Sequence, residues 1–280
     1  MKRIVPLILC FSLTLSLVGC AGTGKVKPLA PSDIEEKEEV SVSLEKRREL
    51  IVGKRFIYNI AWNGIPVGRV IGECGEEIEY RGYKVYPVRI RTESNRYLSK
   101  IYRVEDVYYS FVDASDMTSR RYEADRKEGR YRKHVIVEYD HNAGKAVYTN
   151  LTDGSVKTCD IRDQVHDPVS AFCFFMTLPV KEGDRVSISV NLNEKNFDLY
   201  SLVEGFGTVT VPSLGDFRAF RITPLIILKG KEYRKGRAQM YFSAGEKRYP
   251  LYGVVWIPFG KVTATLDRVE DVDQSLVAGR

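Results

Sequence analysis

The sequence predicts a mainly β fold, a curved antiparallel meander that forms an open barrel or two packed curved sheets around one short buried helix. Three observations predict it. From Lys54 onward apolar and polar residues alternate, turn signals recur about every ten residues, and a single segment near residue 170 breaks the alternation. Short alternating runs between turns are typical of antiparallel sheets and not of parallel α/β folds.

The first predicted strand shows the pattern most clearly. Phe56, Tyr58, Ile60 and Trp62 fall on one face of a strand, and Asn63-Gly64 then supplies a favoured two-residue hairpin turn. The same alternation predicts further strands over residues 67–73, 83–92, 101–112, 131–139, 145–151, 156–161, 185–192, 200–211, 217–224, 237–242, 250–257 and 260–266. A sheet with so many strands is expected to curl or close so that its edges are protected.

One helix is predicted after His166. Asp167 has the chemistry of an N-cap, Pro168 suits the first helical position, and Pro179 stops the run. Apolar residues occur all round this segment, so the helix is expected to be buried across the sheet or in the mouth of the barrel.

The N-terminus has the features of an export signal. Lys2 and Arg3 precede an apolar run too short for a comfortable membrane span, and the run ends in Leu-Val-Gly-Cys, which resembles the lipobox of bacterial lipoproteins. We therefore expect a signal peptide over residues 1–19, a Cys20 that carries acyl chains such as palmitate, a flexible tether over 20–48, a single β-rich domain over 49–272 and a tail over 273–280. In bacteria that resemble the enterobacterial pattern, an Asp directly after the lipidated Cys retains a lipoprotein at the inner membrane. Because Ala21 follows Cys20 here, the outer membrane, on its periplasmic side, is the expected location.

The composition excludes several classes of protein. The 280 residues are 44% hydrophobic and carry a formal charge of +6, which falls to +4 when Lys2 and Arg3 leave with the signal. This apolar fraction supports a folded core, and so mild a basicity in an exported chain argues against nucleic acid as a partner. Membrane contact is expected through Cys20.

The cysteines give no cofactor or metal site. Cys74, Cys159 and Cys173 remain in the mature domain, they form no CxxC pair, and with the three His residues they do not give a metal-ligand spacing. We expect neither a metal nor a cofactor, and we interpret these cysteines as small buried hydrophobic residues.

Two basic stretches around predicted turns are the candidates for binding an anionic ligand or a partner. The residues we select in them are Arg121, Arg126, Arg130 and Arg132 in the first, and Lys231, Arg234 and Arg237 in the second. In a protein tethered to a membrane, such a face suits phospholipid headgroups, lipopolysaccharide phosphates or an acidic protein. The competing interpretation is that these are charged edge strands and loops that keep the sheet soluble.

One cluster has the residue types of a nucleophilic hydrolase. His166 stands just before the helix that carries Ser170 and Cys173, and a Ser or Cys nucleophile needs a base within hydrogen-bond reach. However, Asp167 is better used as a helix cap, Cys173 lies on an apolar face, and no GxSxG elbow is present. We therefore predict no catalytic residue and keep an envelope hydrolase as an alternative.

Several ordered segments carry a family resemblance. They are IAWNGIPVG (60–68), RYEADRKEGRYRKHVIVEYDHNAGKAVY (121–148), HDPVSAFCFF (166–175), GTVTVPSLGDFRAFRITP (207–224), and KGRAQMYFSAGEKRYPLY followed by GKVTATL (235–266). Together they are similar to the bacterial family known as domain of unknown function 3108, with departures at Cys173, Phe174 and residues 243–247. The resemblance implies an exported β-rich envelope protein and supplies no catalytic residues.

The functional expectation combines these points. We expect a non-enzymatic, membrane-anchored envelope lipoprotein that binds an amphipathic ligand, such as a lipid or a lipopolysaccharide-like molecule, or an envelope protein. The alternatives are an envelope hydrolase that uses Cys173 or Ser170 with His166, and a structural lipoprotein of an envelope assembly. Whether the inner face of the sheet is filled or hollow separates ligand binding from a purely structural role.

Overall fold

The computed structural model describes residues 49–228, 231–232, 237–245 and 247–272. The signal peptide, Cys20, the tether, Arg234 and the tail at 273–280 lie outside the described residues. One sheet contains all the strands: β1 (Lys54–Trp62), β2 (Ile65–Cys74), β3 (Ile78–Tyr80), β4 (Tyr83–Ser94), β5 (Glu105–Asp113), β6 (Ser119–Glu128), β7 (Tyr131–Asp140), β8 (Lys145–Asn150), β9 (Val156–Asp160), β10 (Arg185–Leu192), β11 (Lys195–Val211), β12 (Gly215–Leu228), β13 (Lys231–Glu232), β14 (Arg237–Ser243), β15 (Pro250–Ile257) and β16 (Gly260–Asp271). A 3₁₀ turn, η3 (Leu98–Lys100), and the helix α1 (Pro168–Thr177) complete the described elements.

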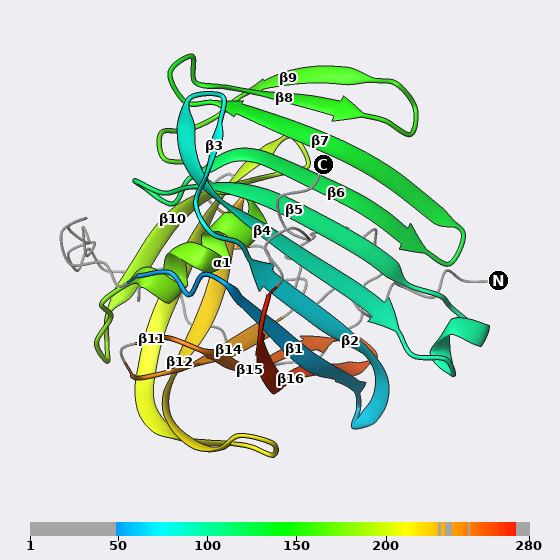
Figure 1. The fold of residues 1–280 in the computed structure, drawn as a ribbon, viewed down its shortest axis with the longest axis vertical. Helices are drawn as coiled ribbons and strands as arrows, with labels where there is room; N and C mark the ends of the chain where they lie inside the picture. The colour runs from blue at the N-terminus through cyan, green and yellow to red at the C-terminus, as the bar shows by residue number, and fades with distance from the viewer. Residues whose placement is uncertain (1–48, 229–230, 233–236, 246, 273–280) are drawn as a thin grey trace.

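The sheet is an open antiparallel meander. Its strand order is β10-β11-β12-β14-β15-β16-β1-β2-β4-β5-β6-β7-β8-β9, with β3 beside β4 and β13 beside β12. Strand β1 pairs with β2 on one side and with β16 on the other, so the first and last strands of the domain meet in the middle of the sheet. Among the described strands β9 and β10 are the two free edges, and the sheet curves between them without closing (Figure 1). The predicted mainly β, open-barrel fold is confirmed.

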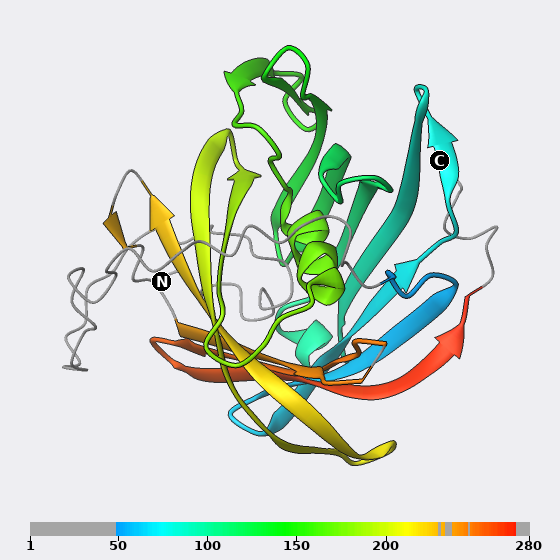
Figure 2. The same ribbon diagram turned by 90° about the vertical axis from the view of Figure 1, so that its left-hand side faces the viewer.

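Helix α1 lies inside the curve of the sheet (Figure 2). The Asp167 carboxylate accepts hydrogen bonds from the backbone N–H groups of Val169 and Ser170, at 2.6 and 2.9 Å, and the Asp167 N–H donates to the Ser170 hydroxyl oxygen in return. This capping box and Pro168 start the helix where the sequence predicts it.

Helix α1 is buried. Phe175 is buried, and Phe172 packs on Phe242 with ring centroids 5.7 Å apart. The prediction of a buried apolar helix is confirmed.

The interior around α1 is packed with side chains. Tyr108, Phe175, Phe220, Phe242 and Leu251 are among the largest fully buried residues, and Phe220 stacks on Phe242 at 5.8 Å. The aromatic alternation in the sequence therefore fills this part of the curved sheet, as alternate residues of each strand face inward. None of the helices in the described ranges is long and apolar enough to cross a membrane.

Several details of the strand predictions were wrong. No strand is predicted over residues 78–80 or 119–128, which form β3 and β6, residues 101–104 precede β5 rather than belong to it, β11 begins at Lys195 instead of Tyr200, and β16 extends to Asp271. Strand β6 lacks the apolar alternation because most of its residues are charged, and it still forms because these charges have partners on the sheet. Arg121, for example, forms ion pairs with Glu123 and Glu138 at 2.9 and 2.8 Å.

Candidate binding cavity

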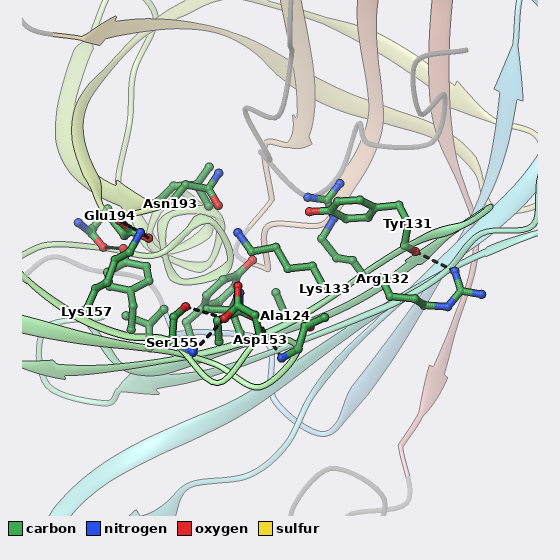
Figure 3. Close-up of a pocket in the computed structure, with 18 of the residues that line it drawn as sticks. Ala124, Tyr131, Arg132, Lys133, Asp153, Ser155, Lys157, Asn193 and Glu194 are labelled. Atoms are coloured by element: carbon green, nitrogen blue, oxygen red, sulfur yellow. Dashed lines mark hydrogen bonds and ion pairs between the residues drawn. The ribbon is translucent and has the colours of Figure 1, made fainter. Parts of the chain in front are cut away.

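A cavity of about 410 Å³ lies on the inner face of β6, β7 and β8 (Figure 3). The loop between β8 and β9 and the turn between β10 and β11 form its walls. Its lining residues are Tyr122, Ala124, Arg126, Tyr131, Arg132, Lys133, Val135, Val137, Tyr139, Tyr148, Asn150, Thr152, Asp153, Ser155, Lys157, Asn191, Leu192, Asn193 and Glu194. This volume is in the range of sites that hold small molecules.

The two-residue period of a β-strand decides which of these side chains face the cavity. Even-numbered residues of β6 and odd-numbered residues of β7 point inward, so Tyr122 lies opposite Val137 in the sheet and Ala124 opposite Val135. The far wall comes from the β10–β11 turn, where Asn193 and Glu194 adopt positive φ angles of 49° and 64°. An ion pair of 3.0 Å from Lys157 to Glu194 fastens this turn to β9.

The inner end of the cavity is aromatic and aliphatic. Val137, Tyr139 and Tyr148 are buried there, and the Tyr148 hydroxyl donates a hydrogen bond to the Asn191 side chain. The hydroxyl groups of Tyr122 and Tyr139 are buried and have no hydrogen-bond partner in the described structure. An unmade hydrogen bond at a buried hydroxyl costs about 1–3 kcal/mol, so an oxygen atom brought within reach of either group would stabilise it.

The outer end is polar and carries an unpaired cation. Lys133 is half-buried and forms no ion pair with any described residue, and its side chain reaches across the cavity toward the Asn193–Glu194 wall (Figure 3). The nearby Asp153 is already held by the Ser155 N–H at 2.9 Å and by the Ser155 hydroxyl at 2.6 Å. These bonds, more than the charges of Lys133 and Lys157, lower the pKa of Asp153. The Lys133 ammonium group is therefore free to meet an anion.

Arg126 lines the cavity and also contacts a buried acidic group, Glu128. Its Nε donates to Glu128 at 2.9 Å, and its guanidinium lies 5.1 Å from the centre of the Tyr131 ring. Asp106 lies beside this pair and accepts a bond from the Lys127 N–H at 2.8 Å. Burial, followed by the charge of Glu128, raises the pKa of Asp106 to about 6.

The structure separates the basic residues that the sequence grouped together. Arg126 and Arg132 line the cavity, whereas Arg121 lies on the opposite face because odd and even residues of β6 point to opposite sides. Arg132 donates to the carbonyl groups of Gly129 and Tyr131, and Arg130 is exposed in the β6–β7 turn. The first stretch surrounds the β6–β7 turn, as predicted, but Arg121 and Arg126 belong to β6 and only Arg130 lies in the turn itself.

The second basic stretch is described only in part. Arg237 begins β14, with its guanidinium 5.0 Å from the Trp256 ring, and Lys231 is described only as a backbone position in β13. Arg234 is not among the described residues. The structure does not bring Arg237 into the cavity.

The hydrolase candidates form a helix anchor. Asp167 accepts from the Ser110 hydroxyl at 2.6 Å and from the Ser119 hydroxyl, and Ser170 bonds to Ser119 at 2.8 Å. The Ser170 oxygen and His166 Nδ1 are 3.5 Å apart, and both residues are buried. This geometry does not favour catalysis, because a substrate would have to enter a closed network.

The cysteines also lack the features of a reactive site. Cys173 is buried, and burial raises the pKa of its thiol well above the ordinary value, which disfavours the reactive thiolate. Cys74 is buried and Cys159 is half-buried, and all three are free thiols. Within the described ranges no three His, Cys, Asp or Glu side chains are grouped so as to hold a metal ion.

A model of a protein family, described as a protein of unknown function (DUF3108), matches residues 57–267. The chain belongs to the DUF3108 family. The match covers most of the described sheet and confirms the resemblance seen in the ordered sequence segments. A search of curated proteins found no match for this DUF3108 protein.

One solved structure supports the same kind of fold. A β-barrel-like protein of domain of unknown function DUF1849 from Brucella abortus is similar over 80% of this chain and 100% of its own, with 10% sequence identity and a TM-score of 0.55. A Bacteroides fragilis protein described as exported, with a YmcC-like fold, covers 80% of this chain and 99% of its own at 12% identity and a TM-score of 0.30. The first likeness supports the fold alone, and the second is too low in TM-score to support an argument.

Sequence reasoning did not find most of the cavity. Lys133 stands in the first basic stretch, but nothing in the linear pattern distinguishes it from its paired neighbours. Tyr139 and Tyr148 were expected only as strand residues, and the β10–β11 turn meets β8 and β9 from about 40 positions away in the chain. The one available signal was the tyrosine alternation in residues 122–148, which marks the inward face.

Proposed function

We propose that this DUF3108 domain is a non-enzymatic binding protein of the cell envelope that holds an amphipathic molecule with an anionic head in the cavity over β6, β7 and β8. The observation that carries the proposal is the unpaired Lys133 at the polar end of a cavity whose inner end is lined by Val137 and Tyr139. An anionic group meets the ammonium of Lys133, and the apolar part of the ligand lies along the valines and tyrosine rings.

The two unpartnered tyrosine hydroxyls support the same ligand class. Tyr122 and Tyr139 each supply a donor at the buried end of the site. An ester or carboxyl oxygen accepts such a bond and removes the cost of the unmade hydrogen bond. A pure hydrocarbon leaves that cost in place. This favours a lipid-like molecule with oxygen atoms close to its chain over an alkane.

The experiment that tests the proposal is a displacement titration. Dodecyl phosphate is titrated against a fluorescent fatty acid bound to the purified protein. Replacement of Lys133 by Met keeps most of the apolar stem and removes the charge, so the affinity is expected to fall about tenfold, the value of one charge-assisted hydrogen bond of roughly 1.5 kcal/mol. Lys145→Met is the matched control, because Lys145 pairs with Asp160 outside the cavity.

Two results would contradict the proposal. One is a wild-type protein that binds neither the probe nor dodecyl phosphate. The other is a Lys133→Met protein that binds dodecyl phosphate as tightly as the wild type does. The urea midpoint of each variant, measured in parallel, separates a lost contact from a lost fold.

Anchoring through Cys20 is the second part of the proposal. The lipobox-like residues 17–20 support lipidation of Cys20, and Ala21 supports the periplasmic face of the outer membrane. Cells fed an alkyne analogue of palmitate are expected to label the wild-type protein and not Cys20→Ala. The labelled protein is expected to separate with outer-membrane vesicles on a density gradient, and its recovery with the inner membrane would contradict the proposed location.

A further inference from the structure

The described surface has one edge where exposed apolar side chains gather. Five large apolar residues are more than 60% exposed: Ile65 at 64%, Tyr97 at 63%, Ile101 at 82%, Val156 at 62% and Phe259 at 63%. All except Val156 lie in or directly beside three connections, the β1–β2 turn, the β4–β5 connection and the β15–β16 turn. Single exposed apolar residues are ordinary, but a group of four at one edge calls for an explanation.

Hydrogen bonds hold the three connections together. The Asn95 side chain donates to the Pro66 carbonyl at 2.7 Å, and the Trp62 ring N–H donates to the Phe259 carbonyl at 3.2 Å. The Lys261 N–H donates to the Asn63 side chain at 2.9 Å. Figure 1 shows the β1–β2 turn and the β4–β5 connection at the same end of the sheet. The exposed residues therefore belong to one ordered surface.

Local backbone geometry keeps these side chains outward. Asn95 accepts hydrogen bonds from the N–H groups of Tyr97 and Leu98 at 3.0 and 2.9 Å, which orders the start of η3. Gly260 has a φ of 127°, and a Cβ atom there would lie 2.2 Å from the Asn63 side chain. Only glycine fits this crossing of the two hairpin turns, where the Phe259 carbonyl accepts a hydrogen bond from the Trp62 ring N–H.

The charge of this edge has one sign. Residues 62–66, 95–103 and 257–261 contain Arg96, Lys100, Arg103 and Lys261 and no Asp or Glu. Arg103 pairs with Glu105 in β5, whereas Lys100 and Lys261 are exposed and form no ion pair with a described residue. Elsewhere on the sheet many cations are paired with carboxylates, as in Arg121–Glu138 and Lys127–Asp125.

We propose that the edge formed by the β1–β2 turn, the β4–β5 connection and the β15–β16 turn is a membrane-contact surface for anionic phospholipid. Ile65, Ile101 and Phe259 enter the boundary between headgroups and acyl chains, and Tyr97 lies at headgroup level with its hydroxyl in water. Lys100 and Lys261 meet the lipid phosphates. This combination of apolar tips and unpaired cations complements an anionic bilayer better than it complements an acidic protein, because an acidic protein does not require so many bare aliphatic tips.

The test is co-sedimentation with vesicles. The chain from residue 20 onward, prepared without lipid, keeps every described strand and helix and lacks the expected acyl anchor. It is mixed with vesicles of phosphatidylcholine alone and with vesicles that also contain phosphatidylglycerol. We expect sedimentation with the mixed vesicles only, with a loss of binding when high salt screens the charges.

Two double variants test the apolar residues and the cations of the surface separately. Ile101→Ser with Phe259→Ser, and separately Lys100→Gln with Lys261→Gln, are each expected to weaken vesicle binding about tenfold or more. Leu202→Ser with Leu214→Ser is the matched control, since those exposed residues lie in β11 and in the β11–β12 turn, away from the three connections. Lys133→Met is expected to leave vesicle binding unchanged, so failure of this proposal and failure of the proposed cavity function are distinguishable.

Three results would overturn the proposal. They are equal binding to both kinds of vesicle, unchanged binding by the Ile101 and Phe259 variant, and a wild-type dimer in sedimentation velocity that the same variant dissociates. The last result would assign the edge to a second copy of the chain. The paired substitutions are all at exposed positions, and urea midpoints close to that of the wild type are expected for them.

Discussion

Single residues show how this sheet uses charge in its interior. Asp106, Arg126 and Glu128 are each no more than 5% exposed, so two carboxyl groups and one guanidinium are buried next to the cavity. Burial first, and then the charge of Glu128, raises the pKa of Asp106 from its ordinary value of 3.8 to about 6, against the opposing effects of the Lys127 N–H, Arg126 and Tyr108. A buried carboxyl group of this kind keeps its proton up to a higher pH than an exposed carboxyl group does.

The sign of the pH effect follows from this shift. Because the folded-state pKa of Asp106 lies above the unfolded value, the stability that the group contributes is fully present below about pH 4 and is lost as the pH rises through 6. Replacement by Asn mimics the protonated form and still accepts the Lys127 bond. The free energy of unfolding of Asp106→Asn is therefore expected to rise, relative to wild type, by about 2 kcal/mol between pH 4 and pH 7.

Urea denaturation across this pH range measures that difference. Asp125→Asn is the control, because Asp125 pairs with Lys127 on the other face of β6. Parallel pH profiles for wild type and Asp106→Asn would show that Asp106 carries no unusual proton affinity.

At the scale of elements, the sequence predicts the helix and the strands whose start and end signals lie close together in the chain. Helix α1 was predictable because Asp167, Pro168 and Pro179 mark its ends within one short segment, and the β1–β2 hairpin was predictable because Asn63-Gly64 matches its turn. Strand β6 was not, because only Tyr122 and Ala124 of its inward residues are apolar and its charges find their partners on β7. The serine network of Ser110 and Ser119 around Asp167 joins residues 48–57 positions apart and leaves no local pattern.

The candidate site could also be predicted only in part from the sequence. The sequence indicates a basic segment near residues 120–133, but it cannot tell that Arg121 is paired on the outer face while Lys133 is unpaired on the inner one. That difference depends on strand parity in β6 and β7 and on which carboxylates reach across the sheet. It depends further on the β10–β11 turn, whose contact with β9 through Lys157 and Glu194 spans 37 positions.

At the scale of the whole molecule, the cavity and the proposed membrane edge lie at the same end of the strands. In an antiparallel meander alternate turns share an end, and β1–β2, β4–β5, β6–β7, β8–β9 and β15–β16 all turn at that end. Tyr131 and Ser155, next to two of these turns, line the cavity. A domain that rests this end on a bilayer therefore brings the polar end of the cavity toward the lipid headgroups.

The central claim is that the cavity over β6, β7 and β8 holds the anionic head of an amphipathic ligand, and a crystal structure of the dodecyl phosphate complex tests it most directly. The account predicts a phosphate oxygen about 2.7–2.9 Å from the Lys133 Nζ, with the alkyl chain against Val135 and Val137. Dodecyl phosphate bound elsewhere, with the cavity unoccupied at saturating concentration, would contradict it.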